Sequence, residues 1–368
     1  MPIRFLTSGE SHGECLNAII EGIGANFELD FDFINSELKA RQGGIGRGGR
    51  MKIETDLIHF NSGVRFSKTT GAPICIEINN RDYKNWLIPM SVEKLDINLL
   101  SKEEKELLKS KTIENVRPGH ADFAGAIKYN QKDIRNILER SSARETTTRV
   151  AVGAICQNIL KNFDIEFDSQ VISLGGENDP EKFEAKVKEA QELGESLGGR
   201  VKITIKNLPI GLGSHVHWDR RLDGKLAQAV MSVPAIKSVE IGLGSKCADS
   251  FGSNVHDEIF LDENERILRH TNNAGGLEGG MTNGEDINIT ASMKPIPTMK
   301  KALKSINLNT KEQVEAHFER ADTAAVHACG VVAKNMCAIV ILDAFFEKFG
   351  SDNYEEIKKN FQNNAKRI

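Results

Sequence analysis

Two histidines stand in glycine-flanked turns, where an imidazole could exchange protons with a bound molecule. His12 lies in SGESHGE (residues 8–14) and His120 in NVRPGHADFAG (residues 115–125). Imidazole titrates near neutral pH, and a glycine-rich backbone lets it approach a substrate closely, so either residue could act as a general acid or base. For His12, an exposed loop histidine without a role is an equally good interpretation. Asp122 is predicted to cap a helix that begins near His120.

A run of five glycines and three arginines, RQGGIGRGGR, occupies residues 41–50. Backbone N–H groups in such a run form anion-binding concavities, and Arg41, Arg47 and Arg50 add forked donors that suit phosphate or carboxylate. The run lacks the Gly-Lys-Ser/Thr of a phosphate-binding Walker loop, and no strand leads into it as in a dinucleotide-binding fold. An anion site, a structural hairpin and a nucleic-acid contact all remain open, and the anion site is favoured.

Arginines in turn-rich contexts are unusually frequent for a chain whose net charge is acidic. Lysine and arginine total 48 against 52 acidic residues, which gives a formal charge of −4 and disfavours a general polyanion binder. The arginines concerned are Arg41, Arg47, Arg50, Arg117, Arg140, Arg144 and Arg320. If they converge, the site binds a multiply charged anion. The residues alone therefore predict an enzyme that acts on a phosphorylated, carboxylated small molecule.

No metal site is expected. His215 and His217 in HVHW lack a cysteine or carboxylate cluster at metal-ligand spacing, which favours a role at the end of a strand. The six cysteines are scattered without CxxC spacing and are predicted to be reduced core thiols, which favours the cytoplasm. The opening residues MPIRFLTSGESHG do not resemble a secretory signal, and no apolar run was found to approach the roughly 18 residues of a membrane span.

The elements that must position these residues are mixed helices and strands. Residues 51–78 alternate as strands do, with Ile74, Ile76 and Ile78 on one face. Helices are expected over residues 181–198, 221–233 and 323–348, the last with Asp322 or Thr323 as its cap. The tail after Gly350 is polar and is expected to be only partly ordered.

Residues 121–163 contain no proline and have a helical pattern throughout. One stripe of this segment is apolar at both ends and polar in the middle: Ile134, Leu138, Ser141, Glu145, Thr148, Val152, Ile155 and Ile159. The polar middle predicts that the helix lines a polar cavity there. The alternative is a helix break near Ser141 that leaves Arg140 and Arg144 in solvent.

Long motifs follow one another from residue 9 to residue 298: GESHG, RQGGIGRGGRMKIE, RPGHAD, ERSSARET, GGLEGGMTNG and MKPIPT. With the Arg-x-Asp of residues 320–322, they closely resemble the chorismate synthase family over nearly the whole chain. The resemblance implies a carbon–oxygen lyase of the shikimate pathway, which eliminates phosphate in an anti-1,4 sense from 5-enolpyruvylshikimate 3-phosphate to give chorismate. It also implies reduced FMN as cofactor, without net redox change, and NAD(P)H is a candidate reductant.

The resemblance also implies roles for individual residues. By motif position, His12 would protonate or stabilise the departing phosphate, His120 would donate a proton at the flavin, and Asp322 would help to remove the ring proton. Substrate would be held by Arg41, Arg47, Arg50, Arg117, Arg144 and Arg320. FMN would lie against Arg140, Ser141, Ser142, Gly279, Lys294, Pro295, Ile296, Pro297, Thr298 and Arg320.

By the same resemblance, the fold class is α+β, a β-α-β sandwich with helices layered between antiparallel sheets, in a homotetramer. We expect a single catalytic domain over residues 1–350, a polar C-terminal tail over residues 351–368, and neither nucleic-acid nor membrane partners. The sequence departs from the family pattern at Ile45, where tyrosine is common, at Pro234, where asparagine is common, and at Thr323, where proline often follows the aspartate.

Two other functions remain open. One is a different flavin- or phosphosugar-acid-binding lyase on the same scaffold. The other is an RNA-binding protein that uses the glycine–arginine loop, and its few aromatic residues, three tyrosines and two tryptophans, weigh against it.

Overall fold

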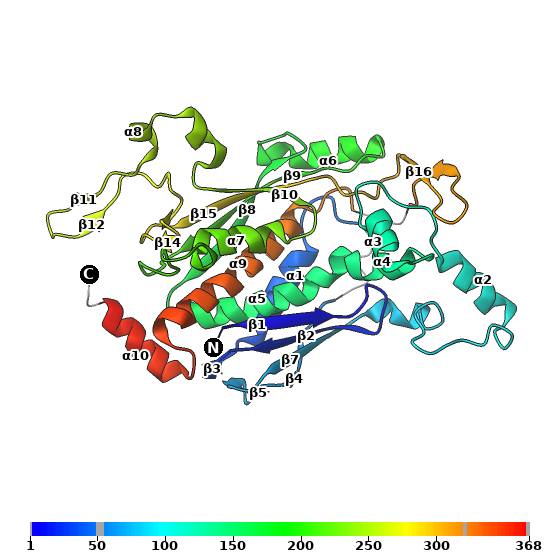
Figure 1. Cartoon of the computed structure of the whole chain (residues 1–368), viewed down its shortest axis with the longest axis horizontal. Helices are drawn as coiled ribbons and strands as arrows, with labels where there is room; N and C mark the ends of the chain where they lie inside the picture. The colour runs from blue at the N-terminus through cyan, green and yellow to red at the C-terminus, as the bar shows by residue number, and fades with distance from the viewer. Residues whose placement is uncertain (1, 49–54, 319–321, 366–368) are drawn as a thin grey trace.

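Two antiparallel four-stranded sheets enclose a layer of helices in the computed structural model, which describes residues 2–48, 55–318 and 322–365 (Figure 1). The first sheet has the order β1-β2-β7-β4 and consists of β1 (Arg4–Ser8), β2 (Cys15–Glu21), β7 (Ile74–Asn79) and β4 (His59–Ser62). The second has the order β10-β15-β9-β8 and consists of β10 (Ile236–Ile241), β15 (Ile287–Met293), β9 (Gly199–Lys206) and β8 (Glu166–Leu174). The expected β-α-β sandwich of the α+β class is confirmed.

Four helices form the middle layer: α1 (Phe31–Gln42), α5 (Thr146–Lys161), α7 (Leu222–Met231) and α9 (Val326–Phe349). Helix α9 packs against α5 and against β8 and β9, while α5 also contacts β2 of the other sheet. Each sheet turns one face toward these helices, because its strands alternate apolar and polar residues. Ile74, Ile76 and Ile78 are fully buried on one face of β7, as the alternation predicted.

The remaining elements are shorter and lie around this core. The strands are β3 (Ala25–Glu28), β5 (Val64–Arg65), β6 (Lys68–Thr70), β11 (Phe260–Leu261), β12 (Ile267–Leu268), β13 (Leu277–Glu278), β14 (Met281–Thr282), β16 (Lys304–Ile306) and β17 (Gln313–Glu315). The helices are α2 (Lys102–Lys111), α3 (Asp122–Tyr129), α4 (Arg135–Ser141), α6 (Phe183–Glu192), α8 (Gly252–Val255) and α10 (Tyr354–Ala365). Of the strands expected over residues 51–78, the first part, residues 51–54, lies outside the described residues.

The continuous helix expected over residues 121–163 is wrong. Helix α3 is closed by its C-cap residue Asn130, which has a left-handed backbone (φ +52°). Helix α4 is closed by its C-cap residue Ser142, whose ψ of +143° is extended. The Ser142 side chain accepts a hydrogen bond from the Arg144 N–H and so starts the next turn, before α5. The break near Ser141 is therefore real, but Arg144 is buried and not in solvent. Of the three polar stripe residues predicted to line a cavity, Ser141 lines the one described below, whereas Glu145 and Thr148 are not among its lining residues.

The C-terminal part of the chain differs from expectation in three ways. Helix α9 begins at Val326, after the segment that contains Asp322 and Thr323, so neither residue caps it. Its 18-residue apolar window is long enough to cross a membrane by length and composition, a feature that the sequence analysis missed, but 83% of that window is buried between the two sheets. Residues 354–365 form a regular helix, α10, in place of the partly ordered tail that was expected. Phe361 of this helix packs against Phe163, Phe345 and Phe349 of the core.

The cysteines follow their prediction only in part. Cys156, Cys329 and Cys337 are buried core thiols, whereas Cys15, Cys75 and Cys247 are half-buried. All six are free thiols.

Candidate active site

A cavity of about 430 Å³ collects most of the candidate residues from segments far apart in the sequence. It lies where the turn after β1, the end of α1, the break between α4 and α5, the loop after β15 and the start of α9 meet. The predicted residues that line it are His12, Arg41, Arg47, Arg117, His120, Ser141, Ser142, Arg144, Lys294, Ile296, Pro297, Thr298 and Asp322. The cavity therefore brings together the three candidate proton-transfer residues and four of the candidate anion-binding arginines.

His12 is held by a carboxylate that the sequence analysis did not single out. Its Nδ1 lies 2.8 Å from Oε1 of Glu139, and its backbone N–H donates to Oε2 of the same carboxylate over 2.7 Å. Arg135, one helical turn before Glu139 on α4, places Nη1 3.3 Å from Oε1. The His12 ring stacks on Trp86 with centroids 3.9 Å apart. His12 is buried, so the interpretation as an exposed loop histidine is wrong.

His120 has a similar partner in Asp122. Nδ1 of His120 lies 2.5 Å from Oδ1 of Asp122, and Arg117 donates to the same carboxylate from Nε over 2.7 Å and from Nη2 over 3.0 Å. Burial alone would raise the pKa of Asp122, but the hydrogen bonds and charges of His120 and Arg117 outweigh it and hold this pKa well below its usual range. Asp122 is thus an anchor for two site residues; the expectation that it caps α3 is wrong, because the N-cap is Ala121.

Each histidine consequently has one ring nitrogen anchored and one left over. A carboxylate only accepts hydrogen bonds, so the Nδ1 that faces it donates; Nδ1 of His120 also lies 3.0 Å from Nη2 of Arg117. Among the described residues, Nε2 of His12 and Nε2 of His120 have no hydrogen-bond partner. Two imidazoles oriented in this way suit proton transfer to or from a molecule in the cavity.

Arg41 and Arg144 share one buried carboxylate, Asp56. Nη2 of Arg41 lies 2.9 Å from Oδ2, and Nη1 of Arg144 lies 2.5 Å from Oδ1. Burial would raise the pKa of Asp56, but the charges of Arg144 and Arg41 outweigh this effect and lower it. Two guanidinium groups on one carboxylate leave a net positive charge beside the cavity. Within the described chain, Nε of Arg41 is buried without an acceptor, so it is a donor that an anion could take.

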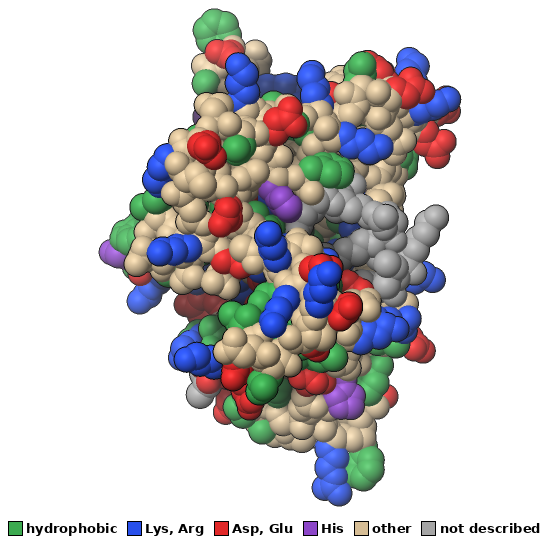
Figure 2. All heavy atoms as spheres, turned by 90° about the vertical axis from the view of Figure 1, so that its right-hand side faces the viewer, with side chains coloured by type: hydrophobic (Ala, Val, Ile, Leu, Met, Phe, Trp, Pro, Cys, Tyr) green, Lys and Arg blue, Asp and Glu red, His purple; other side chains and the backbone are tan. Residues whose placement is uncertain are grey.

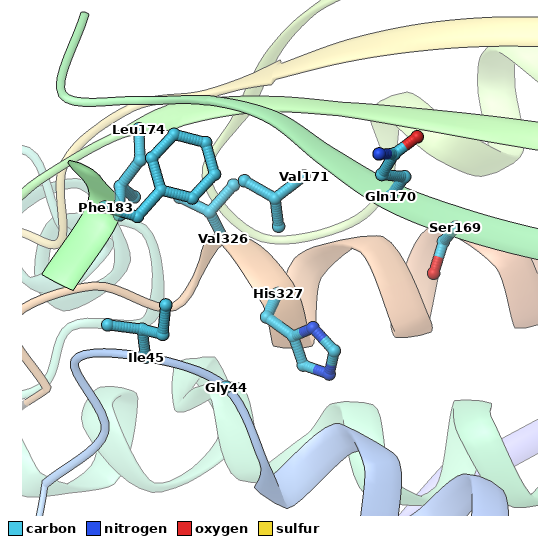
Figure 3. Close-up of a pocket in the computed structure, with 9 residues that line it drawn as sticks. All are labelled: Gly44, Ile45, Ser169, Gln170, Val171, Leu174, Phe183, Val326 and His327. Atoms are coloured by element: carbon cyan, nitrogen blue, oxygen red, sulfur yellow. The ribbon is translucent and has the colours of Figure 1, made fainter. Parts of the chain in front are cut away.

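Asp322 faces the glycine–arginine loop. Nη1 of Arg47 lies 2.5 Å from Oδ2 of Asp322, and the backbone N–H of Gly48 donates to Oδ1 over 2.6 Å. The loop also passes close to the start of α9, as Figure 3 shows for Gly44 and His327. At Gly44 the backbone is left-handed (φ +101°), and a Cβ there would lie 2.5 Å from the His327 Cβ. Glycine is therefore required at this position for both its dihedral angle and its size.

The walls of the cavity divide into a charged part and an apolar part. Its described lining residues include five cations, Arg41, Arg47, Arg117, Arg144 and Lys294, against a single carboxylate, Asp322. The apolar part is formed by Leu138, Val233, Pro234, Ala235, Met293, Ile296, Pro297, Ala325, Ala328, Cys329 and Val332. Burial raises the pKa of the Cys329 thiol to about 12, so this thiol is uncharged and belongs to the apolar wall. Such a cavity suits an anionic ligand that carries a flat apolar ring or binds beside one.

The surface beside α2 has a mixed charge, in contrast to the mostly cationic polar wall of the cavity. Figure 2 views the chain from the side of α2 and shows Lys and Arg interspersed with Asp and Glu among the residues drawn in colour, without a continuous basic patch on this face. This distribution favours a small anion over a nucleic acid as the ligand.

Five predicted residues are not among those that line the cavity. Arg140 donates to the backbone carbonyls of Thr7 and Gly9 over 3.0 and 3.2 Å, so it ties α4 to the turn that carries His12. Gly279 lies in the turn between β13 and β14, with His215 as a neighbour, and Pro295 follows Lys294 without facing the cavity. Arg50 and Arg320 lie outside the described residues. Nearby, His217 is exposed and pairs with Asp219, in a loop and not at the end of a strand.

Comparisons with known proteins support one family. A profile described as chorismate synthase matches residues 3–346. A chorismate synthase of Thermoanaerobacter pseudethanolicus is 53% identical over 359 residues, which cover 98% of this chain and 97% of the relative, and one of Aquifex aeolicus is 48% identical over 394 residues, with 98% and 96% covered. The chain belongs to the chorismate synthase family. A crystal structure of chorismate synthase has the same fold, with a TM-score of 0.78, 40% sequence identity and coverage of 100% of this chain and 98% of that one.

The positions where the sequence departs from the chorismate synthase pattern have different surroundings. Pro234 lies in the apolar wall of the cavity, where it offers neither a side-chain amide nor an N–H donor. Ile45 lines a separate apolar pocket of about 280 Å³ with Phe183 and Val326, on the other side of the loop (Figure 3). A tyrosine at position 45 would therefore change the lining of this second pocket, whereas Pro234 changes the lining of the cavity itself.

Proposed function

We propose that this chain catalyses the anti-1,4-elimination of phosphate from 5-enolpyruvylshikimate 3-phosphate to give chorismate. Membership of the chorismate synthase family supports this reaction. The observation that carries the proposal is one cavity that combines five cations with two carboxylate-anchored histidines. A substrate with a phosphate and two carboxylates requires both features, because its charges must be held and its leaving group must receive a proton.

The arginines that line the cavity would contribute to substrate binding in two ways. Arg41 and Arg144, fixed on Asp56, present forked donors of fixed orientation, which suit the planar or tetrahedral oxygens of carboxylate or phosphate. Arg47 and Arg117 are each paired with a carboxylate, so they hold position before the substrate enters. Arg50 and Arg320 belong to the same proposal by motif position and lie outside the described residues.

The proposed reaction breaks a C–H bond at one end of a four-carbon stretch of the ring and the C–O bond to phosphate at the other end. The C–H electron pair forms a new double bond, the double bond between the two middle carbons shifts by one position, and the C–O electron pair leaves with the phosphate. His12 would deliver a proton from Nε2 to the leaving phosphate or stabilise its charge. His120 would supply a proton at the cofactor from its own Nε2. Asp322, which pairs with Arg47, would assist removal of the ring proton. These three residues line one cavity, so the transfers can take place on one bound substrate.

The cofactor proposed for this site is reduced FMN, with NAD(P)H as a candidate source of its electrons. When bound, the flavin supplies an electron transiently and recovers it, so the reaction has no net redox change. The apolar part of the cavity wall fits a flat ring of this kind, and Ser141, Ser142, Lys294 and Thr298 add polar groups at its edge. Arg140, Gly279 and Pro295 stay in the proposed cofactor set by motif position alone.

We also propose a cytoplasmic homotetramer with the chain as a single catalytic domain. The outer face of the first sheet supports self-association, because Leu6 and Ile19 face each other across β1 and β2 and are 73% and 50% exposed. Sedimentation equilibrium would measure the number of chains, and a monomer at micromolar concentration would contradict this part of the proposal.

The histidine roles can be tested by anaerobic phosphate release with chemically reduced FMN. His12→Ala and His120→Ala should each lower turnover by roughly 10²–10⁴-fold, the range typical of a lost general acid or base. His256→Ala, at an exposed histidine that directly follows α8, is the control and should keep the wild-type rate. Near wild-type rates in both site variants would remove the histidines from the mechanism.

A further inference from the structure

Both oxygens of the Glu139 carboxylate are engaged by the same residue, His12. Oε1 accepts from the ring Nδ1 over 2.8 Å and Oε2 accepts from the backbone N–H over 2.7 Å. The side chain of Glu139 is only 2% exposed, and that of His12 only 9%. A carboxylate that accepts hydrogen bonds from both the ring and the backbone of one residue restricts the orientation of that ring.

The face of the His12 ring is fixed as well. Trp86 stacks on it with an interplanar angle of 26°. Lys111 and Arg135 place their charged groups over the same indole, 4.2 and 5.1 Å from a ring centroid, and the indole Nε1 donates to Asp82 over 2.9 Å. The indole is therefore locked from several sides, and the imidazole has little freedom to rotate.

The turn that carries His12 is also held from the side of β7. Nδ2 of Asn80 donates to the carbonyl of Gly13 over 2.7 Å and to that of Glu10 over 3.2 Å. The backbone N–H of Ser11 donates to the carbonyl of Glu139 over 3.0 Å, so ring and turn are tied to the same residue of α4. A buried carboxylate is costly unless it is paired and hydrogen-bonded, and the partners of Glu139 are His12 and Arg135.

We propose that Glu139 is a positioning residue for His12, with Trp86 as the platform for the ring. Because the carboxylate accepts from Nδ1–H, Nε2 is the nitrogen left for the cavity, where it can meet the leaving phosphate. The charged groups around this imidazole are Glu139 and Arg135 on α4, Lys111 on α2 and Asp82 behind Trp86. The catalytic part of this inference rests on the proposed function, whereas the coupling of Glu139 to His12 does not.

The first test is kinetic and uses anaerobic phosphate release. Glu139→Gln keeps the shape but presents an amide N–H₂ to one of the two His12 donors, so one contact is lost and the charge is gone. Its kcat should fall by about 10- to 100-fold, as for other partners that orient a functional histidine, while KM changes much less. Glu139→Asp keeps the charge and should recover part of the rate. Glu145→Gln is the matched control, since Glu145 is also buried and pairs with Arg149 at i,i+4 but does not touch His12.

The second test needs neither substrate nor cofactor. The chain has two tryptophans, and Trp218 is 76% exposed, so Trp218→Phe leaves Trp86, stacked on His12, as the single tryptophan, which can be excited selectively above the tyrosine band. A protonated imidazole quenches indole emission more than a neutral one, so emission should change in a step with pH that His12→Ala abolishes. In the Glu139→Gln variant the step should move, because the carboxylate that pairs with the ring is missing.

The outcomes separate the possible failures. A Glu139→Gln enzyme with unchanged kcat and an unmoved fluorescence step overturns the proposal, as does a Glu145→Gln variant that loses as much activity. If wild-type protein releases no phosphate, the proposed function fails, but the fluorescence step still tests the coupling. Should Glu139→Gln fail to fold by circular dichroism, Trp86→Leu takes its place. It removes the platform and should lower kcat about tenfold or more, whereas Trp86→Phe retains an aromatic ring and should stay within about threefold; equal rates in both would overturn the role of the stack.

Discussion

Replacing Asp56 by asparagine should destabilise the fold strongly, because this one carboxylate is the shared ion-pair partner of two buried arginines. Arg41 and Arg144 approach it to 2.9 and 2.5 Å, and the side chains of all three residues are at most 4% exposed. Removing one partner of a buried ion pair costs about 3–5 kcal/mol, since the remaining charge loses its compensation. An unfolding entropy of about 2.1 cal/mol/K per residue gives about 0.8 kcal/mol/K for 368 residues, so Tm should fall by roughly 4–6 °C.

Differential scanning calorimetry of wild-type protein and Asp56→Asn at pH 7 measures this shift. Asp219→Asn is the control, because Asp219 is exposed and pairs only with the exposed His217, and its Tm should stay at the wild-type value. The variant should also bind substrate more weakly, because the two guanidinium groups would no longer be held in place. An Asp56→Asn protein that unfolds at the wild-type temperature, or an Asp219→Asn protein that loses as much, would refute the reasoning.

Three further predictions concern the anchor of His120, the glycine–arginine loop and its arginine. The pKa of Asp122 is lower in the folded chain than the roughly 3.9 of an unfolded aspartate, so the contribution of this carboxylate to stability is complete above about pH 4 and is lost as the pH falls further. The Tm difference between wild type and Asp122→Asn should therefore shrink from pH 6 to pH 2.5, and a constant difference would contradict this. Gly44→Ala places a Cβ 2.5 Å from His327 at a φ of +101° and should cost about 1–3 kcal/mol in urea unfolding, whereas Gly43→Ala, at a φ of −81°, should cost far less. Arg47→Ala should raise KM about 10- to 100-fold through a lost charged hydrogen bond and should lower kcat too, since Arg47 also holds Asp322; an unchanged KM would remove Arg47 from substrate binding.

Features of the fold that depend on local alternation could be predicted from the sequence. Ile74, Ile76 and Ile78 face one side because side chains alternate along a strand, and all three are buried. The break between α4 and α5 entered the sequence analysis only as the alternative to a continuous helix, because residues on both sides continue the same helical pattern. What ends α4 is the extended backbone of Ser142 and its bond to the Arg144 N–H, which is a local choice that periodicity does not detect.

The candidate site was predicted by its charged and titratable residues but not by the partners that orient them. Glu139 is the first residue of the ERSSARET motif, and Asp122 stands two positions after His120, so the sequence offered a signal for both of these carboxylates. Asp56 and Trp86 carry no such signal, because each meets its partner only after distant segments fold together: Asp56 reaches Arg144 across 88 positions. The number of arginines in the sequence does not indicate which carboxylate forms an ion pair with each of them.

The most direct measurement of the central proposal is the stoichiometry of the anaerobic reaction with chemically reduced FMN. With excess 5-enolpyruvylshikimate 3-phosphate, the wild-type chain should release one phosphate per chorismate formed, over many turnovers per flavin, and the flavin should end reduced. His12→Ala with native circular dichroism should show the same flavin binding and a far slower release. Folded wild-type protein that releases no phosphate, or that oxidises one flavin for each phosphate released, would contradict an elimination without net redox change.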